Sequence, residues 1–249
     1  MLFRSNVVIL GGTRGTGRAL ARLLAARGDR IVLLGRNPDE LRRSASDLES
    51  HGTAQPVGIV PCDLNDRAAH VSAIAAAADV LGSIDVVIVT AALFAMQDDL
   101  ERDPALLARL LETDFVDTIL FCEAARKQLL EQGGGTLCVF SSVAGDRGRK
   151  PVILYGAAKA GLSYYLEGLD HKFRRQGLKV VCIKPGFIRT SATAGLKPPP
   201  FAADPDDVAR AALRGIDRGT PVVYAPPIWR WVMLVIRNLP RFVMRRIGF

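Results

Sequence analysis

The chain has 249 residues, of which 49% are hydrophobic and 23% charged, and its formal net charge is +8. This length and composition suit one α/β domain with a full core, and they exclude a disordered or fibrous chain. Most of the excess charge lies at the C-terminus, where residues 228–249 contain five arginines and no acidic residue. Nucleic-acid binding is not expected, because no recognised reader motif accompanies these arginines.

The four cysteines lie far apart and form no CxxC motif or Cys/His cluster, so neither a zinc site nor a disulfide framework is predicted. Residues 6–10 lead directly into a glycine loop, which is not the pattern of a signal peptide. No segment reaches the roughly 18–20 apolar residues that a membrane span needs. We therefore expect a cytoplasmic protein, either free or attached peripherally to the inner face of the membrane.

Short β-branched runs alternate with longer helical patterns along the chain. The predicted strands are 6–10, 30–34, 58–61, 86–90, 136–141, 179–183 and 222–224. The predicted helices are 17–26, 38–49, 67–81, 104–132, 155–175 and 204–218. Such alternation predicts βαβ units and a single Rossmann-type, doubly wound parallel sheet of about seven strands.

Two proline-rich segments lie near the end of the chain. Residues 197–204 predict a loop that closes over a site, and Asp204 is expected to cap the helix that follows it. The pair Pro226-Pro227 then marks a boundary. Residues 1–226 are expected to form the α/β domain, and residues 227–249 a basic amphipathic extension.

A glycine-rich segment follows the first predicted strand and opens the first predicted helix. Its residues are Gly11, Gly12, Thr13, Arg14, Gly15, Thr16 and Gly17. Glycines at such a turn let the backbone approach a pyrophosphate, whose charge is favoured at the N-terminus of the helix. The spacing is Gly-x3-Gly-x-Gly and not GxGxxG, but its place in the first βα unit predicts dinucleotide binding.

The end of the second predicted strand indicates which dinucleotide is bound. NAD-binding proteins usually place an acidic residue there for the ribose 2′-hydroxyl, whereas this chain has Leu34-Gly35-Arg36-Asn37. Arg36 and Arg14 can instead face a 2′-phosphate, to which a guanidinium forms charge-assisted hydrogen bonds. NADP(H) is therefore predicted in preference to NAD(H). The alternative is that both arginines are ordinary solvated surface residues.

Three polar residues form the candidate catalytic group. Tyr155 and Lys159 are four residues apart at the start of a predicted helix, which places them on one face. Ser142 lies thirteen residues before Tyr155, at the end of a predicted strand. A YxxxK match alone has little specificity, but the ordered set of glycine loop, serine, tyrosine and lysine is specific.

This ordered set resembles the short-chain dehydrogenase/reductase family, as do the segments Cys62-Asp63-Leu64 and Lys184-Pro185-Gly186-Phe187-Ile188-Arg189-Thr190. The resemblance implies reversible hydride transfer between a nicotinamide cofactor and a carbonyl or secondary alcohol. It also implies a homodimer or homotetramer that associates through the helices predicted at 104–132 and 155–175. Beyond the glycine loop and Arg36, the cofactor-binding residues it implies are Asp63, Leu64, Ala91, Tyr155, Lys159, Pro185, Gly186, Ile188 and Thr190.

The chemistry explains why these residue types occur together. A free tyrosine has a pKa near 10, which is high for an acid–base group at neutral pH. The ammonium of Lys159 is expected to favour the phenolate and so lower the pKa of Tyr155. Tyr155 then donates its proton to the carbonyl oxygen as hydride arrives, while Ser142 donates a hydrogen bond to the same oxygen.

The chain departs from the family pattern at two places. The family's Asn-Asn-Ala-Gly segment is replaced by Val89-Thr90-Ala91-Ala92, and Asp114 aligns with the asparagine that completes the family's proton relay. A carboxylate only accepts hydrogen bonds, whereas an amide also donates. We therefore expect Asp114 to favour the charged form of Lys159 and to leave the enzyme active with an altered pH profile. The alternative is that Asp114 is a solvated or helix-facing residue and the alignment is shifted by one turn.

The C-terminal extension combines tryptophans, aliphatic residues and arginines. On a helical wheel Arg230, Arg237, Arg241 and Arg245 share one side, and Pro240 must end or kink the helix. The apolar residues on the opposite side are Trp229, Val232, Met233, Ile236, Leu239, Val243 and Ile247. This pattern is typical of a helix in a membrane interface, and equally of a helix whose apolar face docks on the enzyme body or on a partner subunit.

The segments Tyr224-Ala225-Pro226-Pro227 and Trp229-Arg230-Trp231-Val232-Met233 resemble one branch of the family, the decaprenylphosphoryl-2-keto-ribose reductases. This resemblance implies a keto group on a lipid-linked sugar, such as a polyprenylphosphoryl 2-keto-pentose, as the substrate. Two other functions remain open. One is a cytosolic ketone or 3-ketoacyl reductase whose extension packs on its own body, and the other is a non-catalytic NADP-binding sensor or scaffold.

Overall fold

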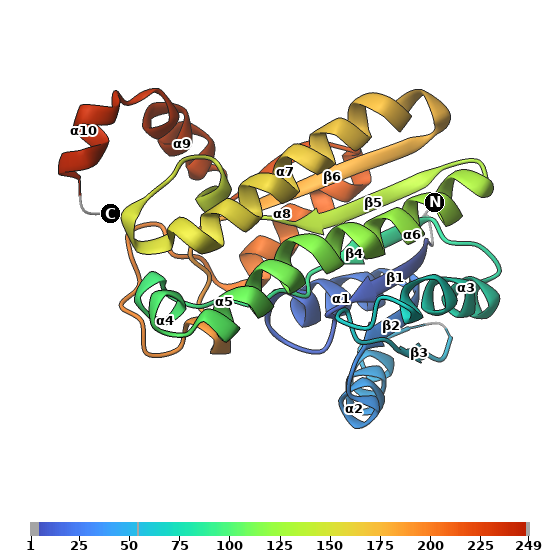
Figure 1. Ribbon diagram of the computed structural model, residues 1–249. Helices are drawn as coiled ribbons and strands as arrows, with labels where there is room; N and C mark the ends of the chain where they lie inside the picture. Colours follow the sequence, from blue (N-terminus) through green and yellow to red (C-terminus); the bar gives the residue numbers. More distant parts are fainter. Residues whose placement is uncertain (1–4, 54, 248–249) are drawn as a thin grey trace.

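Seven parallel strands form one sheet in the order β3-β2-β1-β4-β5-β6-β7 (Figure 1). The computed structural model of the protein describes residues 5–53 and 55–247. The strands are β1 (Asn6–Leu10), β2 (Arg30–Gly35), β3 (Gly58–Pro61), β4 (Val86–Val89), β5 (Gly135–Phe140), β6 (Leu178–Pro185) and β7 (Val222–Ala225). β4 consists of four buried aliphatic residues, as expected for a strand that is covered on both faces. The predicted α/β fold with one doubly wound parallel sheet is confirmed.

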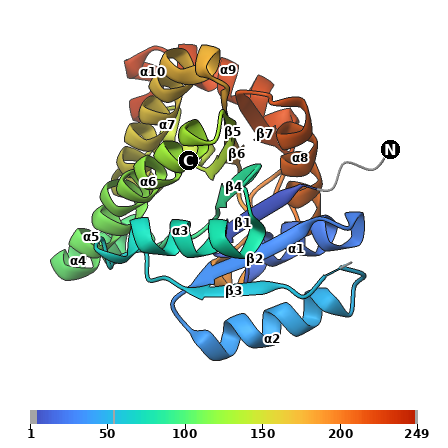
Figure 2. The ribbon, with the colours of Figure 1, turned by 90° about the vertical axis from the view of Figure 1, so that its right-hand side faces the viewer.

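Helices cover both faces of this sheet (Figure 2). One face carries α1 (Gly15–Arg27), α2 (Pro38–Glu49) and α8 (Pro205–Arg218). The other carries α3 (Ala69–Leu81), α6 (Thr118–Glu131) and α7 (Ile153–Phe173). Each layer has its own hydrophobic cluster, and the four cysteines are buried as free thiols within these clusters.

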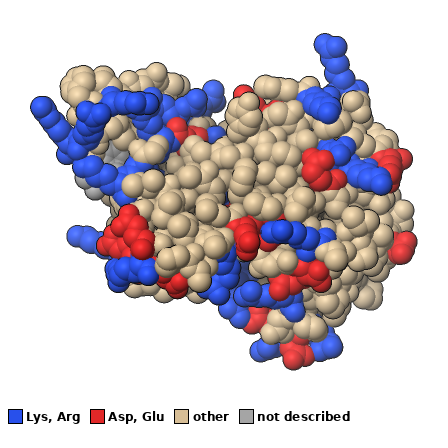
Figure 3. All heavy atoms as spheres, in the orientation of Figure 1, with Lys and Arg blue, Asp and Glu red and all other residues tan. Residues whose placement is uncertain are grey.

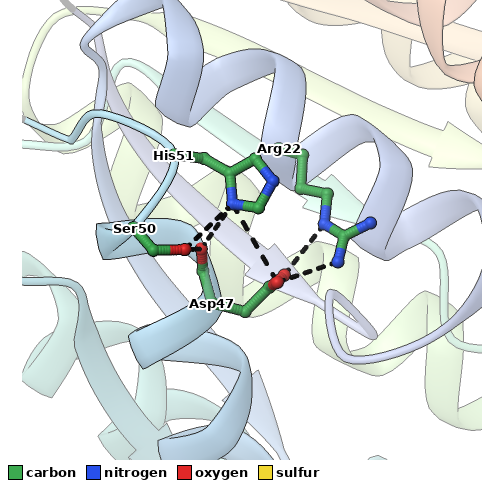
Figure 4. A network of polar contacts seen from close by, with 4 residues as sticks. All are labelled: Arg22, Asp47, Ser50 and His51. Carbon is green, nitrogen blue, oxygen red and sulfur yellow. Dashed lines mark hydrogen bonds and ion pairs between the residues drawn. The ribbon is translucent and has the colours of Figure 1, made fainter.

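The chain reverses its direction of winding at β1, which pairs with β2 on one side and β4 on the other. In open parallel sheets, ligands bind at the carboxyl ends of the strands beside such a reversal. α2 borders this region and is tied to α1 by the Arg22 guanidinium, which donates to both Asp47 carboxylate oxygens at 2.8 and 2.9 Å (Figure 4). His51 and Ser50 contact the carbonyl oxygen of Asp47 and close this small network at the end of α2.

The helix predicted at 104–132 is interrupted, so its prediction as one regular helix was wrong. It consists of α5 (Pro104–Leu111), a π-helical turn (Glu112–Asp117) and α6. A π turn inserts one residue into the α-helical repeat, which leaves the composition and the apolar pattern of the sequence nearly unchanged. A further short helix, α4 (Gln97–Arg102), was not predicted, because six residues are too few for a clear helical period.

The loop before α8 connects two elements at the carboxyl edge of the sheet. Ile188 and Ala203 form an isolated parallel bridge across the base of this loop. Asp204 occupies the N-cap position of α8, but the expected side-chain cap is absent. Its carboxylate instead accepts a hydrogen bond of 2.9 Å from Arg189, because that guanidinium lies on the other arm of the loop.

The C-terminal extension folds into α9 (Ile228–Asn238) and α10 (Arg241–Arg246), with the predicted break at Pro240. Trp229, Met233 and Ile236 are buried in a cluster with Val143, next to the candidate catalytic serine. The apolar face of α9 is thus packed on the protein's own body, which is one of the arrangements that the sequence left open. No helix among the described residues is long and apolar enough to cross a bilayer.

Two further contacts attach the extension to the segment that precedes α7. Arg147 donates to the carbonyl oxygen of Leu239 at 2.9 Å, and Lys150 donates to that of Arg245 at 2.8 Å. The solvent-facing side of the extension is both cationic and apolar, and arginine side chains project from this part of the molecule (Figure 3). The most exposed apolar side chains of the extension are Trp231, Leu234, Val235 and Phe242.

Two adjacent residues of α9 test whether the extension is part of the folded body. Met233 is fully buried and Leu234 is 53% exposed. Met233→Ala should lower the free energy of unfolding by about 2–5 kcal/mol, because it leaves a cavity. Leu234→Ala should change it by less than about 0.5 kcal/mol. Equal denaturant midpoints for the two variants would contradict the docking of α9.

Candidate functional site

The candidate catalytic residues come from three elements at the carboxyl edge of the sheet. Ser142 follows β5 and is 7% exposed. Its hydroxyl oxygen accepts a hydrogen bond of 3.1 Å from the Ala144 amide, which caps the 3-10 turn Val143–Gly145. This local bond fixes the rotamer of Ser142 where the strand ends.

Tyr155 and Lys159 lie on the first turns of α7, as their spacing predicts. The Lys159 Nζ is 5.6 Å from the centroid of the Tyr155 ring. The Phe94 ring packs edge-on against Tyr155 with 5.2 Å between centroids, so the phenol is held between an apolar ring and an ammonium. The start of α7 is itself held by α4, because the Gln97 side chain accepts from the Leu154 amide at 3.0 Å.

Asp114 lies in the π-helical turn and is fully buried. One carboxylate oxygen accepts from the Leu93 amide at 2.6 Å, and the other is 3.1 Å from the Lys159 Nζ. The alternative in which Asp114 is solvated or turned away from the site is therefore wrong. The turn aims this carboxylate at the lysine, and the two form a buried ion pair.

The charges around Tyr155 differ from the simple expectation. Burial raises the pKa of Tyr155, Lys159 lowers it, Asp114 raises it again, and a hydrogen bond with Ser142 lowers it. The net direction is upward, so the expected lowering of the phenol's pKa by Lys159 is outweighed. Burial by itself would lower the pKa of Lys159, but Asp114 and Tyr155 raise it above its ordinary value. The main reason for the raised pKa of Tyr155 is its partial burial, and the Asp114 carboxylate adds to it by compensating the ammonium that would otherwise favour a phenolate.

In the glycine turn after β1, the backbone at Gly17 lies close to the backbone at Gly11. A Cβ atom at Gly17 would collide with the Gly11 carbonyl oxygen and with the Thr90 side chain. The Thr90 hydroxyl donates toward the carbonyl oxygens of Leu10 and Gly11, at 3.2 and 3.0 Å. Thr90 therefore supports the turn from β4. Sequence analysis noted this residue only as a departure from the family pattern.

A pocket of about 240 Å³ lies beside this turn, at the carboxyl end of β2. Its lining residues are Thr13, Arg14, Gly35, Arg36, Asn37 and Glu40. The two arginines that the sequence pairs are thus brought to one pocket. Glu40 was not predicted as a site residue, because it lies on α2 and only the fold brings it to this pocket. Its carboxylate forms an ion pair with Arg14. This contact raises the pKa of Arg14 and lowers that of Glu40.

The other residues that sequence analysis assigned to the cofactor lie along the same edge. Asp63 and Leu64 follow β3, Ala91 follows β4, and Pro185 ends β6. Their common location follows from the parallel sheet, which places the carboxyl ends of all its strands on one side.

The segment after β6 reaches both the glycine turn and the extension. The Thr190 methyl group lies 3.5 Å from where a Cβ atom at Gly15 would be. Ile188 packs against the core cluster that α1 and α8 share. A Cβ atom at Gly186 would collide with the indole of Trp229, so glycine there lets α9 approach. Sequence analysis did not predict this contact.

A larger groove of about 1030 Å³ lies among α7, α8, β7 and α9. Lys184, Arg214 and Tyr224 line it, but Ser142 and Tyr155 do not. Its location away from these side chains indicates that size alone does not identify the site. We place the candidate site at the carboxyl edge of the sheet beside the switch of β1 and β4, because the glycine turn and the catalytic group both lie at that edge.

Comparisons with known proteins show the family of the chain. The family model described as short chain dehydrogenase matches residues 5–199. An uncharacterized oxidoreductase of Mycobacterium tuberculosis (strain H37Rv) is 36% identical over 240 residues, which cover 96% of each chain. An uncharacterized oxidoreductase of Streptomyces coelicolor is 34% identical over 249 residues, which cover 97% of this chain and 95% of the other.

Solved structures give the same fold. A short-chain type dehydrogenase/reductase from Mycobacterium ulcerans superimposes with a TM-score of 0.79 over 88% of this chain and 86% of its own. The two sequences are 22% identical, so this likeness concerns the fold alone.

Proposed function

Because this chain belongs to the short-chain dehydrogenase family, we propose that it is an NADPH-dependent reductase of a carbonyl group. As a member of the family it is an oxidoreductase that acts on alcohol or carbonyl groups and uses a nicotinamide dinucleotide. The observation that carries the proposal is that Ser142, Tyr155 and Lys159 come together, at the same carboxyl edge of the sheet as the glycine turn. The turn fits such a cofactor, because its glycines leave the backbone open to a pyrophosphate at the N-terminus of α1.

Each of the three side chains has a separate role in the reaction. The bound nicotinamide supplies the hydride to the carbonyl carbon. Tyr155 donates its phenolic proton to the carbonyl oxygen, and the Ser142 hydroxyl donates a hydrogen bond to the same oxygen. Lys159 would hold the cofactor ribose, and its ammonium lies beside the phenol. In the direction of alcohol oxidation, the Tyr155 phenolate accepts the proton.

The preference for NADP(H) rests on the pocket at the end of β2. Arg36 and Arg14 both line it, and a 2′-phosphate is a good partner for two guanidinium groups. Glu40 is already paired with Arg14, which leaves Arg36 as the arginine without a carboxylate partner at this pocket. The alternative is NAD(H) binding, in which the Glu40 carboxylate accepts from the ribose hydroxyls.

We assign the substrate to lipid-linked carbonyl compounds, such as the keto form of a polyprenylphosphoryl pentose. The extension packs on the segment between Ser142 and Tyr155, and its exposed side combines four large apolar side chains with arginines. Such a surface suits an anionic bilayer, and it would hold the catalytic edge close to a lipid-borne keto group. A cytosolic ketone or 3-ketoacyl reductase is the alternative, followed by a non-catalytic NADP-binding sensor or scaffold.

Association into a homodimer or homotetramer is part of the proposal. Leu120 on α6 and Tyr164 on α7 are exposed, at 41% and 82%. Both helices are those through which the sequence predicts association.

Tyr155→Phe tests the reductase itself. The variant removes the proton donor and should slow NADPH oxidation, measured with a panel of ketones, keto-sugars and 3-ketoacyl compounds, by about 10²–10⁴-fold. NADPH binding, followed by its fluorescence, should stay within a few-fold. Tyr164→Phe is the control, because Tyr164 lies on the same helix but is exposed. A Tyr155→Phe variant as active as the control would refute the proposed mechanism.

Arg36→Ala tests the cofactor preference. Loss of a charge-assisted bond to the 2′-phosphate should raise the KM for NADPH about 10- to 100-fold, whereas the KM for NADH should hardly change. Arg42→Ala is the matched control, because Arg42 is exposed on α2 and pairs with Asp39 outside the pocket. Equal use of NADH and NADPH by the unaltered protein would contradict the preference.

Vesicle flotation tests the membrane surface. Deleting the extension is unsuitable, because Trp229 and Met233 are buried in the body. The full chain should float with phosphatidylcholine vesicles only when they contain anionic phosphatidylglycerol, and less so at high salt. Replacing Trp231, Leu234, Val235 and Phe242 by serine should abolish flotation. Val71→Ser with Val80→Ser on α3 should leave it unchanged, and recovery of the full chain only in the unbound fraction would remove the membrane proposal.

A further inference from the structure

The pairing of Asp114 with Lys159 affects proton transfer by Tyr155. This inference rests on the proposed function. We propose that Asp114 is a positioning residue that neutralises the Lys159 ammonium and so keeps Tyr155 protonated from neutral into alkaline pH. The residue thereby keeps the proton donor for carbonyl reduction available over that range. The same pairing withholds the phenolate that alcohol oxidation needs.

The geometry of the pair carries this inference. Asp114 is fully buried and Lys159 is 1% exposed, so water does not screen their interaction. The nearest carboxylate oxygen lies 3.1 Å from the Lys159 Nζ. The other oxygen accepts from the Leu93 amide at 2.6 Å, which holds the carboxylate in place. Burial raises the pKa of Asp114 above its ordinary value, and the Lys159 ammonium and the Leu93 amide oppose this rise because both favour the charged form. Asp114 is therefore fixed as a counter-ion by the π-helical turn and by the backbone after β4.

A compensated lysine acts on a phenol differently from a free one. A lone ammonium stabilises a nearby phenolate, and the effect is strong in a buried site. Here the ammonium and the carboxylate together carry no net charge, and Tyr155 faces a dipole in place of a full positive charge. An asparagine at this position, as the family pattern has, would leave the charge of the lysine uncompensated.

Within the described part of the chain, no further charged group acts on Tyr155 to replace the positive charge that Asp114 compensates. The groups that act on Tyr155 are Lys159, Asp114 and the neutral hydroxyl of Ser142. The Cys182 thiol of β6 also faces Lys159, and burial raises its pKa to about 11, so that it is uncharged at neutral pH.

The next ion pair along the sheet is compensated as well. The Lys184 ammonium lies 2.6 Å from an Asp146 carboxylate oxygen. Because the two charges are opposite and adjacent, their combined electrostatic effect on more distant groups such as Tyr155 is small. Among the described residues, the state of Tyr155 is thus governed by burial and by the Asp114–Lys159 pair.

The direction of the pH effect follows from these contacts. Burial raises the pKa of Tyr155 and Asp114 adds to the increase, so the phenol loses its proton only at high pH. Carbonyl reduction requires the protonated phenol, and its rate falls as the pH rises through this pKa. Alcohol oxidation requires the phenolate, and its rate rises through the same pKa. Without the Asp114 charge, both changes should occur at lower pH.

Asp114→Asn, in the complete protein, provides the kinetic test. The alkaline fall in kcat/KM for NADPH-dependent reduction should move to lower pH by at least one unit, and the acid side of alcohol oxidation should move with it. Asp117→Asn is the matched control. Asp117 is a buried aspartate of the same π-helical turn, but its carboxylate accepts from Asn65 and Arg67. Profiles of Asp114→Asn that superimpose on those of the unaltered protein would overturn the proposal.

A spectroscopic test needs neither cofactor nor substrate, and it separates this inference from the proposed function. The ultraviolet absorbance of tyrosinate is titrated in the cofactor-free protein and in Tyr155→Phe, and the difference isolates Tyr155. In the unaltered protein the midpoint should lie above the ordinary value of about 10. A midpoint below that value would refute the role of Asp114, even if Asp114→Asn fails to fold. In a folded Asp114→Asn protein the midpoint should be at least one unit lower.

Discussion

The parallel sheet, buried on both faces, is the constraint on which the rest of the molecule depends. Its central strands have almost no solvent face, so their backbone groups pair with each other and their interior side chains are nearly all apolar. The functional residues are therefore confined to the loops and helix starts at the carboxyl edge. The reversal of winding at β1 opens that edge between β1 and β4, and the glycine turn follows β1 at this opening.

Placing charges in this buried edge requires each one to have a partner. A buried ion that lacks a counter-ion is costly, and removing one member of a buried pair destabilises more than a surface pair would. The Asp114–Lys159 and Asp146–Lys184 pairs meet this requirement on either side of Ser142. The same compensation that allows Lys159 to be buried also limits its effect on the phenol. Stability and proton transfer are thus linked through one carboxylate.

The C-terminal extension packs against residues that flank the candidate site. Trp229 packs on Gly186, which follows β6, and Met233 and Ile236 join the cluster around Val143. Arg147 and Lys150 bind backbone carbonyls of the extension, so the segment between Ser142 and Tyr155 is held from outside. Binding of a membrane or a partner to the exposed side of the extension would therefore be transmitted to the segment between Ser142 and Tyr155.

The order of strands and helices, the glycine turn and the spacing of Ser142, Tyr155 and Lys159 were determined by the sequence itself. These features depend on local periodicity and on residues a few positions apart, which a single chain displays directly. The pairing of Asp114 with Lys159, the support of the turn by Thr90, the Arg14–Glu40 contact and the docking of α9 were decided only by the tertiary structure. They join residues that are remote along the chain, and the register of the sheet and one π-helical turn bring them together.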